Sequence, residues 1–273
     1  MDQSPHQGPP ASPSVDVVVI TWDDDPAMVR RAVCSALDQP GVPVHVQLVD
    51  NGSAVPVPAP TDPRVRLLRS ERNLGVAAGR NLGARAGRSP LVCFLDSDAV
   101  LRPGSLARLV AAATSPGVGL SAPVFAGQAP EASAGRAPGL RVKAARALGR
   151  RGTYEAVPHG DGAVWPVDFA IGACQVVRRS AFEQVGGLDE GYFYGPEDVD
   201  FCLRLAEAGW ASVQVAGAPV DHPPRRRYRR PLDRQGLRHA WAVLRHLRRH
   251  RRQRPAGVVA AGAGSASGAG GAR

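Results

Sequence analysis

Residues 91–98 read LVCFLDSD, five apolar residues followed directly by two carboxylates one residue apart. An apolar run of this length is typical of a strand that is buried on both faces of a parallel sheet. Ligands of open parallel sheets bind at the carboxyl ends of the strands. The run therefore predicts a buried central strand whose end places Asp96 and Asp98 at a ligand-binding edge.

The segment Asp96-Ser97-Asp98 also predicts a metal site. Two carboxylates one residue apart can share a divalent cation, and the hard ions Mg²⁺ and Mn²⁺ favour oxygen ligands. The alternative is a solvated turn, in which Asp and Ser are common. We favour a site for Mg²⁺ or Mn²⁺ because two other polar strand ends are expected beside it.

Outward from this strand, strands and helices alternate along the chain. Short apolar runs predict strands over 15–21, 44–49, 65–68, 118–124, part of 167–177 and 211–215. Helical spacing of apolar residues predicts helices over 26–37, 76–86, 103–113 and 197–208, and Ser180 and Glu183 have the capping-box spacing that starts a short helix. This order predicts an α/β fold with a mostly parallel sheet flanked by helices.

Composition divides the chain into four parts. Residues 1–14 and 255–273 are rich in small residues, Pro and Gly, and we expect them to be disordered. Residues 15–222 form the predicted folded domain, with a long excursion over 126–158 that includes a predicted helix at 140–148. Residues 223–254 are a basic extension, in which 225–254 hold 13 Arg and one acid, a formal charge of +12. Because the whole chain has a formal charge of +10, the remaining residues have a charge of −2.

The basic extension has helical spacing over 237–250, with apolar residues on one face and Arg on the remainder. A basic amphipathic helix of this kind can lie on an anionic membrane surface through Arg225–Arg254. It can also pack on the domain through its apolar face, or bind nucleic acid, which we rank last. We favour the membrane surface slightly over packing.

The cysteines and the amino terminus indicate the compartment. Cys34, Cys93, Cys174 and Cys202 form no CxxC pair, and each lies in an apolar stretch, so we expect four small core residues with free thiols. The sequence has neither a signal-peptide pattern nor an apolar run long enough to span a membrane. We therefore expect a cytoplasmic protein that associates peripherally with the inner face of the cell membrane.

Polar residues also end the first two predicted strands. Thr21 ends the first, and Asp50 ends the second before Asn51-Gly52. Asp50 either forms an Asx turn or accepts hydrogen bonds from a nucleobase or ribose, and its sequence context leaves both open. Acidic and polar groups therefore accumulate at one predicted edge of the sheet.

Residues 73–83 frame the start of the predicted helix over 76–86. Asn73 and Gly75 precede the helix, Gly75 permits close backbone approach, and Arg80 near a helix amino terminus suits a diphosphate. Ordinary helix packing is the alternative. The segment has no GxGxxG sequence, so we expect no dinucleotide cofactor.

Glu197 and Asp198 start the predicted helix over 197–208. Acids at this position complement the helix dipole, which is a sufficient structural explanation. A general base also has to be ionised, and a helix amino terminus favours that form. His222 follows the last apolar run, where a lone histidine is more often a surface residue than a metal ligand.

Five segments occur in one order: VDVVVITW (15–22), VDNGS (49–53), NLGVAAGRNLG (73–83), FLDSD (94–98) and YGPEDVDFCLRLAEAGW (194–210). Together they resemble family 2 glycosyltransferases of the GT-A fold, and they look most like the bacterial branch of rhamnosyl- and related glycosyltransferases. The resemblance spans roughly residues 15–222. It implies inverting transfer from a nucleotide-diphosphate sugar to an acceptor hydroxyl in cell-envelope glycan or glycolipid synthesis, with a glycan or lipid-linked acceptor.

The resemblance also implies roles for single residues. Asp50 would bind the base, Arg80 would lie near the nucleotide or diphosphate, and Asp198 would be the general base. The remaining implied contacts are ribose and metal for Asp96, metal for Asp98, support of the base or acceptor binding for Glu197, and metal or diphosphate for His222. The sequence departs from the family at Trp22-Asp23-Asp24-Asp25, where a Tyr-Asn-Arg-type sequence is usual, and in the Pro and Arg run after His222.

Three other functions compete with glycosyl transfer. A nucleotidyltransferase would need a basic phosphate-binding loop near the first strand, where the segment 22–26 (WDDDP) is acidic. A nucleotide-sugar binding protein without transfer activity would not need Asp96, Asp98 and Asp198 together. An RNA-binding protein would depend on the basic extension alone.

Overall fold

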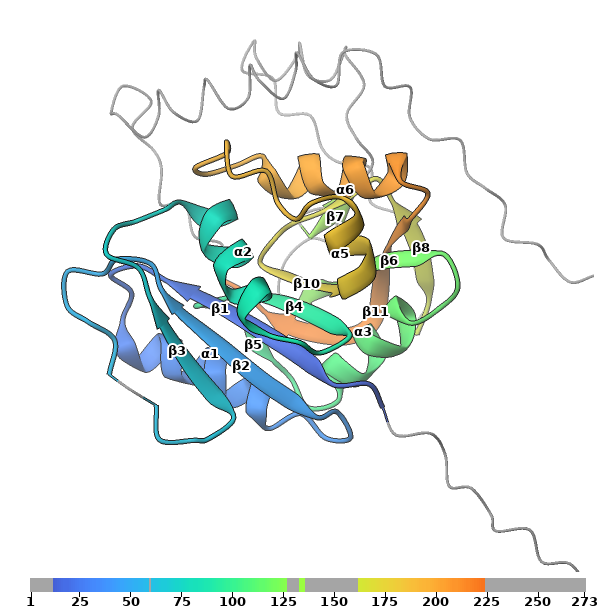
Figure 1. The fold of residues 1–273 in the computed structure, drawn as a ribbon. Coiled ribbons are helices and arrows are strands. Elements are labelled where there is room, and N and C mark those ends of the chain that lie inside the picture. Colours follow the sequence, from blue (N-terminus) through green and yellow to red (C-terminus); the bar gives the residue numbers. More distant parts are fainter. Residues whose placement is uncertain (1–11, 59, 127–132, 136–161, 224–273) are drawn as a thin grey trace, which may run out of the picture.

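The computed structural model describes residues 12–58, 60–126, 133–135 and 162–223. The predicted helix over 140–148 and most of the basic extension lie outside these ranges. Residues 1–11 of the predicted disordered segment 1–14, and all of 255–273, also lie outside them. The described residues form a layered α/β structure around one large mixed sheet (Figure 1). Among them, no helix combines the length and the apolar character that crossing a membrane requires.

The predicted elements that fall within the described residues appear in the predicted order, with several short strands added. The strands are β1 (Val15–Thr21), β2 (Val44–Asp50), β3 (Val65–Arg69), β4 (Leu91–Asp96), β5 (Val100–Leu101), β6 (Val118–Ala126), β7 (Ala134–Gly135), β8 (Val164–Val167), β9 (Phe169–Ala170), β10 (Cys174–Arg178) and β11 (Ala211–Asp221). The helices are α1 (Pro26–Leu37), α2 (Val76–Ala86), α3 (Ser105–Ala113), α5 (Arg179–Gln184) and α6 (Glu197–Glu207).

The sheet order is β3-β2-β1-β4-β10-β6-β11-β5, with β8 paired to β11. The first four strands are mutually parallel, whereas β10 runs antiparallel to both of its neighbours, β4 and β6. Thr21 pairs with Asp50, and Ile20 pairs with Asp96. The polar ends of β1, β2 and β4 therefore lie side by side at one edge of the sheet, as the sequence predicts.

Alternating side chains of the strands bury two apolar cores, one on each face of the sheet. One core joins the apolar faces of α1 and α3 to residues such as Val17 and Val19. The other joins α2, α5 and α6 to residues such as Val18 and Phe94. Covering both faces with helices explains why β4 is apolar up to its last residue, Asp96.

Three local predictions were wrong, and one predicted strand is longer than expected. The short helix α5 begins at Arg179 and has no side-chain cap, so Ser180 does not start a capping box. Helix α3 begins at Ser105, because Gly104 has a left-handed backbone (φ 80°) that the helix cannot include. Cys34 is exposed, because it lies off the stripe of α1 that faces the sheet. The last strand, β11, continues past residue 215 to Asp221 through an irregularity in its pairing with β6.

Candidate functional site

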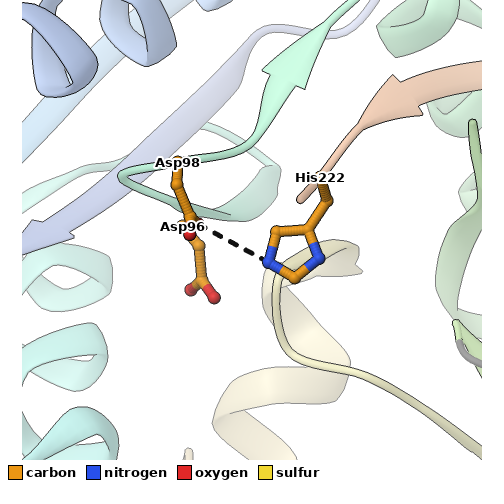
Figure 2. Close-up of side chains that lie close together, drawn as sticks. All are labelled: Asp96, Asp98 and His222. Carbon is orange, nitrogen blue, oxygen red and sulfur yellow. Dashed lines mark ion pairs between the residues drawn. The ribbon is translucent and has the colours of Figure 1, made fainter. Parts of the chain in front are cut away.

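Asp96, Asp98 and His222 form a cluster at the polar edge of the sheet. One ligand atom from each side chain lies within 4.8 Å of the other two. Asp98 follows β4 and His222 follows β11, and Nε2 of His222 is 3.5 Å from Oδ1 of Asp98 (Figure 2). The His222 ring packs on Phe125, with 5.0 Å between ring centroids. The structure therefore brings together the three residues that the sequence proposed as metal ligands.

Arg80 connects this cluster to the start of α6. Its side chain is 4% exposed, and Nη2 donates to Oδ1 of Asp96 (2.6 Å) and to the carbonyl of Gly172 (2.8 Å). Nη1 lies 3.5 Å from Oε1 of Glu197. The guanidinium is thus committed to other protein groups. Burial would lower the pKa of Arg80, but the charges of Asp96 and Glu197 outweigh it and raise that pKa.

Gly172 links Arg80 to the predicted general base. The Gly172 carbonyl accepts from Arg80, while the Gly172 N–H donates to Oδ2 of Asp198 (3.1 Å). The other carboxylate oxygen of Asp198 accepts from the Val199 N–H (2.8 Å). A Cβ at position 172 would collide with Nη1 of Arg80, so a larger residue there would displace the buried guanidinium. The backbone of one residue therefore contacts both the cation, through its carbonyl, and the carboxylate, through its N–H.

Glu197 and Asp198 are both shifted towards the neutral form. Burial raises the pKa of Glu197 to about 7, the charge of Asp198 adds to the rise, and Arg80 opposes it. Burial likewise raises the pKa of Asp198, although the hydrogen bonds from Gly172 and Val199 oppose it. Oε2 of Glu197 is buried and has no hydrogen-bond partner among the described residues. Glu197 therefore exchanges its proton near neutral pH, and the pKa of Asp198 is raised by the same burial, as is common for acid–base groups.

The raised pKa of Glu197 predicts a pH-dependent stability. The folded protein retains a proton on Glu197 where the unfolded chain has released it, between pH 4.5 and about 7. The free energy of unfolding should therefore fall as the pH rises through this window. Glu197→Gln has no proton to lose and should flatten the fall, which urea unfolding across the window measures. An unchanged pH slope in the variant would contradict the shift.

Arg80→Met is expected to lower the free energy of unfolding by about 3 kcal/mol, because the buried Glu197 carboxylate loses its compensating charge. The matched control is Arg85→Met on the same helix, where Arg85 forms an exposed ion pair with Glu190. That substitution should cost at most about 1 kcal/mol. Urea unfolding at neutral pH compares the two variants, and equal losses would show that the burial of Arg80 is unimportant.

Asp50 lies at the same edge, two strands from Asp96. Its carboxylate accepts from the backbone N–H groups of Ser53 (2.9 Å) and Val57 (3.1 Å) and forms an ion pair with Arg69. Burial of the Asp50 carboxylate opposes its ionisation. The hydrogen bonds and the charge of Arg69 outweigh burial and hold the pKa of Asp50 below the ordinary value. Asp50 is therefore an ionised group that organises the loop after β2.

The end of β1 is joined to the Asp96-Ser97-Asp98 segment through Asp24. Oδ2 of Asp24 accepts from the hydroxyls of Thr21 (3.1 Å) and Ser97 (2.6 Å). Thr21 is buried, so its hydroxyl serves this internal bond. Asp24, from the acidic sequence after β1, therefore holds the Asp96-Ser97-Asp98 segment in place.

Asn73 and Gly75 shape the start of α2. The Asn73 side chain accepts from the Asn51 amide (3.0 Å) and from the Gly75 N–H (2.8 Å). Gly75 has φ 87°, and a Cβ there would lie 2.6 Å from the carbonyl oxygen of Phe193. That oxygen also accepts from the first N–H of α2, that of Val76 (2.8 Å). In the structure, the freedom of Gly75 lets the segment before α6 pack closely.

Two residues of this network, Asp24 and Gly172, were not among the sequence candidates. Asp24 belongs to the acidic run after β1, whose departure from the family pattern was its only signal. Gly172 interrupts the apolar pattern over 167–177, and a glycine inside a strand pattern marks close backbone approach. Both sequence signals mark the position of the residue in the chain, but neither identifies the side chains that it contacts in the structure.

The sequence model of the family described as Glycosyl transferase family 2 matches residues 16–186, which are more than half of the chain. The match includes Asp50, Arg80, Asp96 and Asp98, and it ends before Glu197 and His222.

Two curated relatives from Mycobacterium tuberculosis are similar in sequence. N-acetylglucosaminyl-diphospho-decaprenol L-rhamnosyltransferase is 58% identical over 57 residues, which are 21% of this chain and 19% of the relative. Pre-mycofactocin glycosyltransferase is 34% identical over 212 residues, which are 75% of this chain and 42% of the relative. The matched part is therefore less than half of the length of either relative.

A solved structure confirms the fold class. The crystal structure of GalNAc-T7 with UDP, GalNAc and Mn²⁺ superposes with a TM-score of 0.66 at 15% sequence identity, over 88% of this chain and 48% of that one. The shared architecture is that of GT-A glycosyltransferases.

Proposed function

Because the chain belongs to glycosyl transferase family 2, we propose that it transfers a sugar from a nucleotide-diphosphate sugar to an acceptor hydroxyl, with inversion at the anomeric carbon. The observation that carries the proposal is the convergence of two groups of residues. Asp96, Asp98 and His222 gather after β4 and β11, and the Glu197-Asp198 pair is tied to them through Arg80. The domain that performs the reaction is residues 15–222.

The Asp96, Asp98 and His222 cluster fits a divalent cation. Two carboxylates and an imidazole are suitable ligands for Mn²⁺, and the carboxylates also suit Mg²⁺. Asp96 has a side chain 33% exposed, so it can be reached from solvent. When bound, the ion supplies positive charge for the departing diphosphate. The GalNAc-T7 structure, which has the same fold, contains UDP and Mn²⁺.

In this mechanism Asp198 is the general base. Its two oxygens are oriented by the N–H groups of Gly172 and Val199, and it removes the proton of the acceptor hydroxyl. Beside it, Glu197 is ionised or protonated according to pH. The positive charge of Arg80 limits the rise in the pKa of both acids. Inversion follows when the hydroxyl attacks the face opposite the leaving diphosphate.

The donor nucleotide binds along the ends of β1 and β2. Ionised Asp50 accepts hydrogen bonds from the base, and Thr21, Asn73 and Gly75 shape the loops around it. Arg80 contributes by holding Asp96 in place. These assignments rest on the family resemblance and on the position of each residue at the polar edge of the sheet.

The acceptor is a glycan or lipid-linked glycan of the cell envelope. The name of one relative, N-acetylglucosaminyl-diphospho-decaprenol L-rhamnosyltransferase, includes a lipid diphosphate and rhamnose, which supports this class. The basic extension Arg225–Arg254 then holds the enzyme at an anionic membrane surface on the cytoplasmic side. Nucleic acid is not proposed as a partner.

A panel of nucleotide-diphosphate sugars, including rhamnose donors, tests the proposal. The protein with Mn²⁺ should release nucleoside diphosphate from one donor faster than from the others, and a lipid-linked acceptor should accelerate the release. Donor binding without hydrolysis or transfer, under every acceptor condition, would favour a binding protein. Release of inorganic pyrophosphate from a nucleoside triphosphate and a sugar phosphate, offered in a separate assay, would favour a nucleotidyltransferase.

A further inference from the structure

The face of the sheet that carries α2 is covered only in part. Helix α2 packs on Val18 and Val49, near the carboxyl ends of β1 and β2, and ends at Ala86. Side chains alternate along a strand, so the same face continues towards the amino ends with other residues. These are Asp16 on β1, His45 and Gln47 on β2, and Arg66 on β3.

An open groove of about 420 Å³ lies over these residues. Its floor is the uncovered part of the sheet, and its walls are the end of α2 with the following residues 86–89 and the residues before β3, Pro63 and Arg64. The groove is at the amino ends of the strands, whereas Asp96 and Asp98 lie at the carboxyl ends. It is therefore separate from the proposed transfer site.

Gln47 is an unusual residue for this position. Its side chain lines the groove, yet the residue is only 6% exposed. Oε1 of its amide is buried and has no hydrogen-bond partner among the described residues. Buried polar groups are almost always hydrogen-bonded, because an unmade bond costs stability. The buried Oε1 is an acceptor and does not bind an anion, so the group of Gln47 that can bind an anionic ligand is its NH₂, which donates.

The charges around Gln47 are positive. Arg66 is its register partner on β3, and Nη1 of Arg66 makes one long bond, 3.4 Å, to the carbonyl of Ala86. Arg88 is exposed at the rim. Asp16, the acid of the floor, is neutralised by Arg179, whose Nη2 lies 2.8 Å from it. Arg66 and Arg88 are therefore available to bind an anion in the groove, and the one carboxylate on its floor, that of Asp16, is paired with Arg179.

We propose that this groove binds a phosphate group, with Arg66 and Arg88 as its cationic ligands and the Gln47 amide as a hydrogen-bond donor. The ligand is a phosphate ester in solution or the headgroup of a phospholipid. The carboxyl end of α2 lies beside the groove and carries partial negative charge, which opposes an anion. The arginines must therefore supply the attraction, and their removal is the decisive test.

The test compares two double variants with equal loss of charge. Arg66→Ala/Arg88→Ala removes the groove arginines, whereas Arg30→Ala/Arg31→Ala removes two exposed arginines of α1, on the opposite face of the sheet. Calorimetric titration of metal-free protein with inorganic phosphate measures soluble binding. Sedimentation with phosphatidylglycerol vesicles, against phosphatidylcholine vesicles, measures headgroup binding.

The groove variant should lose at least about tenfold in affinity, and the α1 variant should lose less than about twofold. Selective loss in the phosphate titration identifies a soluble phosphate ligand, and selective loss only with vesicles identifies a lipid headgroup. Equal behaviour of the two double variants in both assays would overturn the proposal. Gln47→Leu, which leaves the charge unchanged, should weaken the same binding about threefold; unchanged affinity would remove the amide from the site.

Discussion

Asp198→Asn is expected to lower the rate of sugar transfer by about a thousandfold, because the side chain can no longer accept the proton of the acceptor hydroxyl. Donor affinity should remain largely intact, since the proposed metal ligands lie elsewhere, on Asp96, Asp98 and His222. The substitution has a structural cost as well. The NH₂ that replaces one carboxylate oxygen cannot accept a hydrogen bond, so either the Gly172 or the Val199 N–H loses its partner.

Transfer and donor binding have to be measured separately for this variant. Single-turnover transfer reports the chemical step, and calorimetric titration with nucleoside diphosphate and Mn²⁺ reports the donor site. Glu207→Gln, an exposed acid at the other end of α6, is the control and should leave both quantities unchanged. Undiminished turnover of Asp198→Asn would refute its assignment as the base.

Removal of divalent cations is expected to abolish transfer, with a loss of at least about a thousandfold, because the charge on the leaving diphosphate is then uncompensated. Excess EDTA should stop the reaction, and an excess of Mn²⁺ or Mg²⁺ over the chelator should restore it. Full transfer in EDTA would remove the metal from the mechanism.

Asp98→Asn tests the same metal site through the protein. The loss of one carboxylate ligand should raise the Mn²⁺ concentration needed for half-maximal transfer by about tenfold or more. Asp221→Asn is the matched control, because Asp221 lies next to His222 but forms an ion pair with Arg102 at 2.7 Å. An equal response of the two variants would argue against a specific role for Asp98.

The regular elements around the site could be predicted because their signals are local. The strands over 15–21 and 91–95 are apolar on both faces, and the helices over 26–37 and 76–86 have apolar residues at helical spacing, so a few adjacent residues suffice. Strands β5, β7 and β9 have two residues each and no period to detect. Their existence depends on the pairing partner that the fold supplies.

The spacing at Ser180 and Glu183 shows the limit of a local motif. It is correct for a capping box with Ser180 as the N-cap, yet the N-cap of α5 is Arg178, two residues earlier, at the end of β10. The pairing of β10 with β4 and β6 determines where the strand ends, and the helix has to begin there. Tertiary pairing therefore overrides the capping preference.

By itself, the sequence determined that Asp96 and Asp98 follow a buried strand and that Glu197 and Asp198 start a helix. Both features depend only on neighbours along the chain. Only the tertiary structure decided that His222 lies beside Asp98 and that buried Arg80 joins Asp96 to Glu197, with Gly172 between Arg80 and Asp198. These contacts join residues far apart in sequence, and they form because packing of β10, β11 and α6 against the parallel strands brings them together.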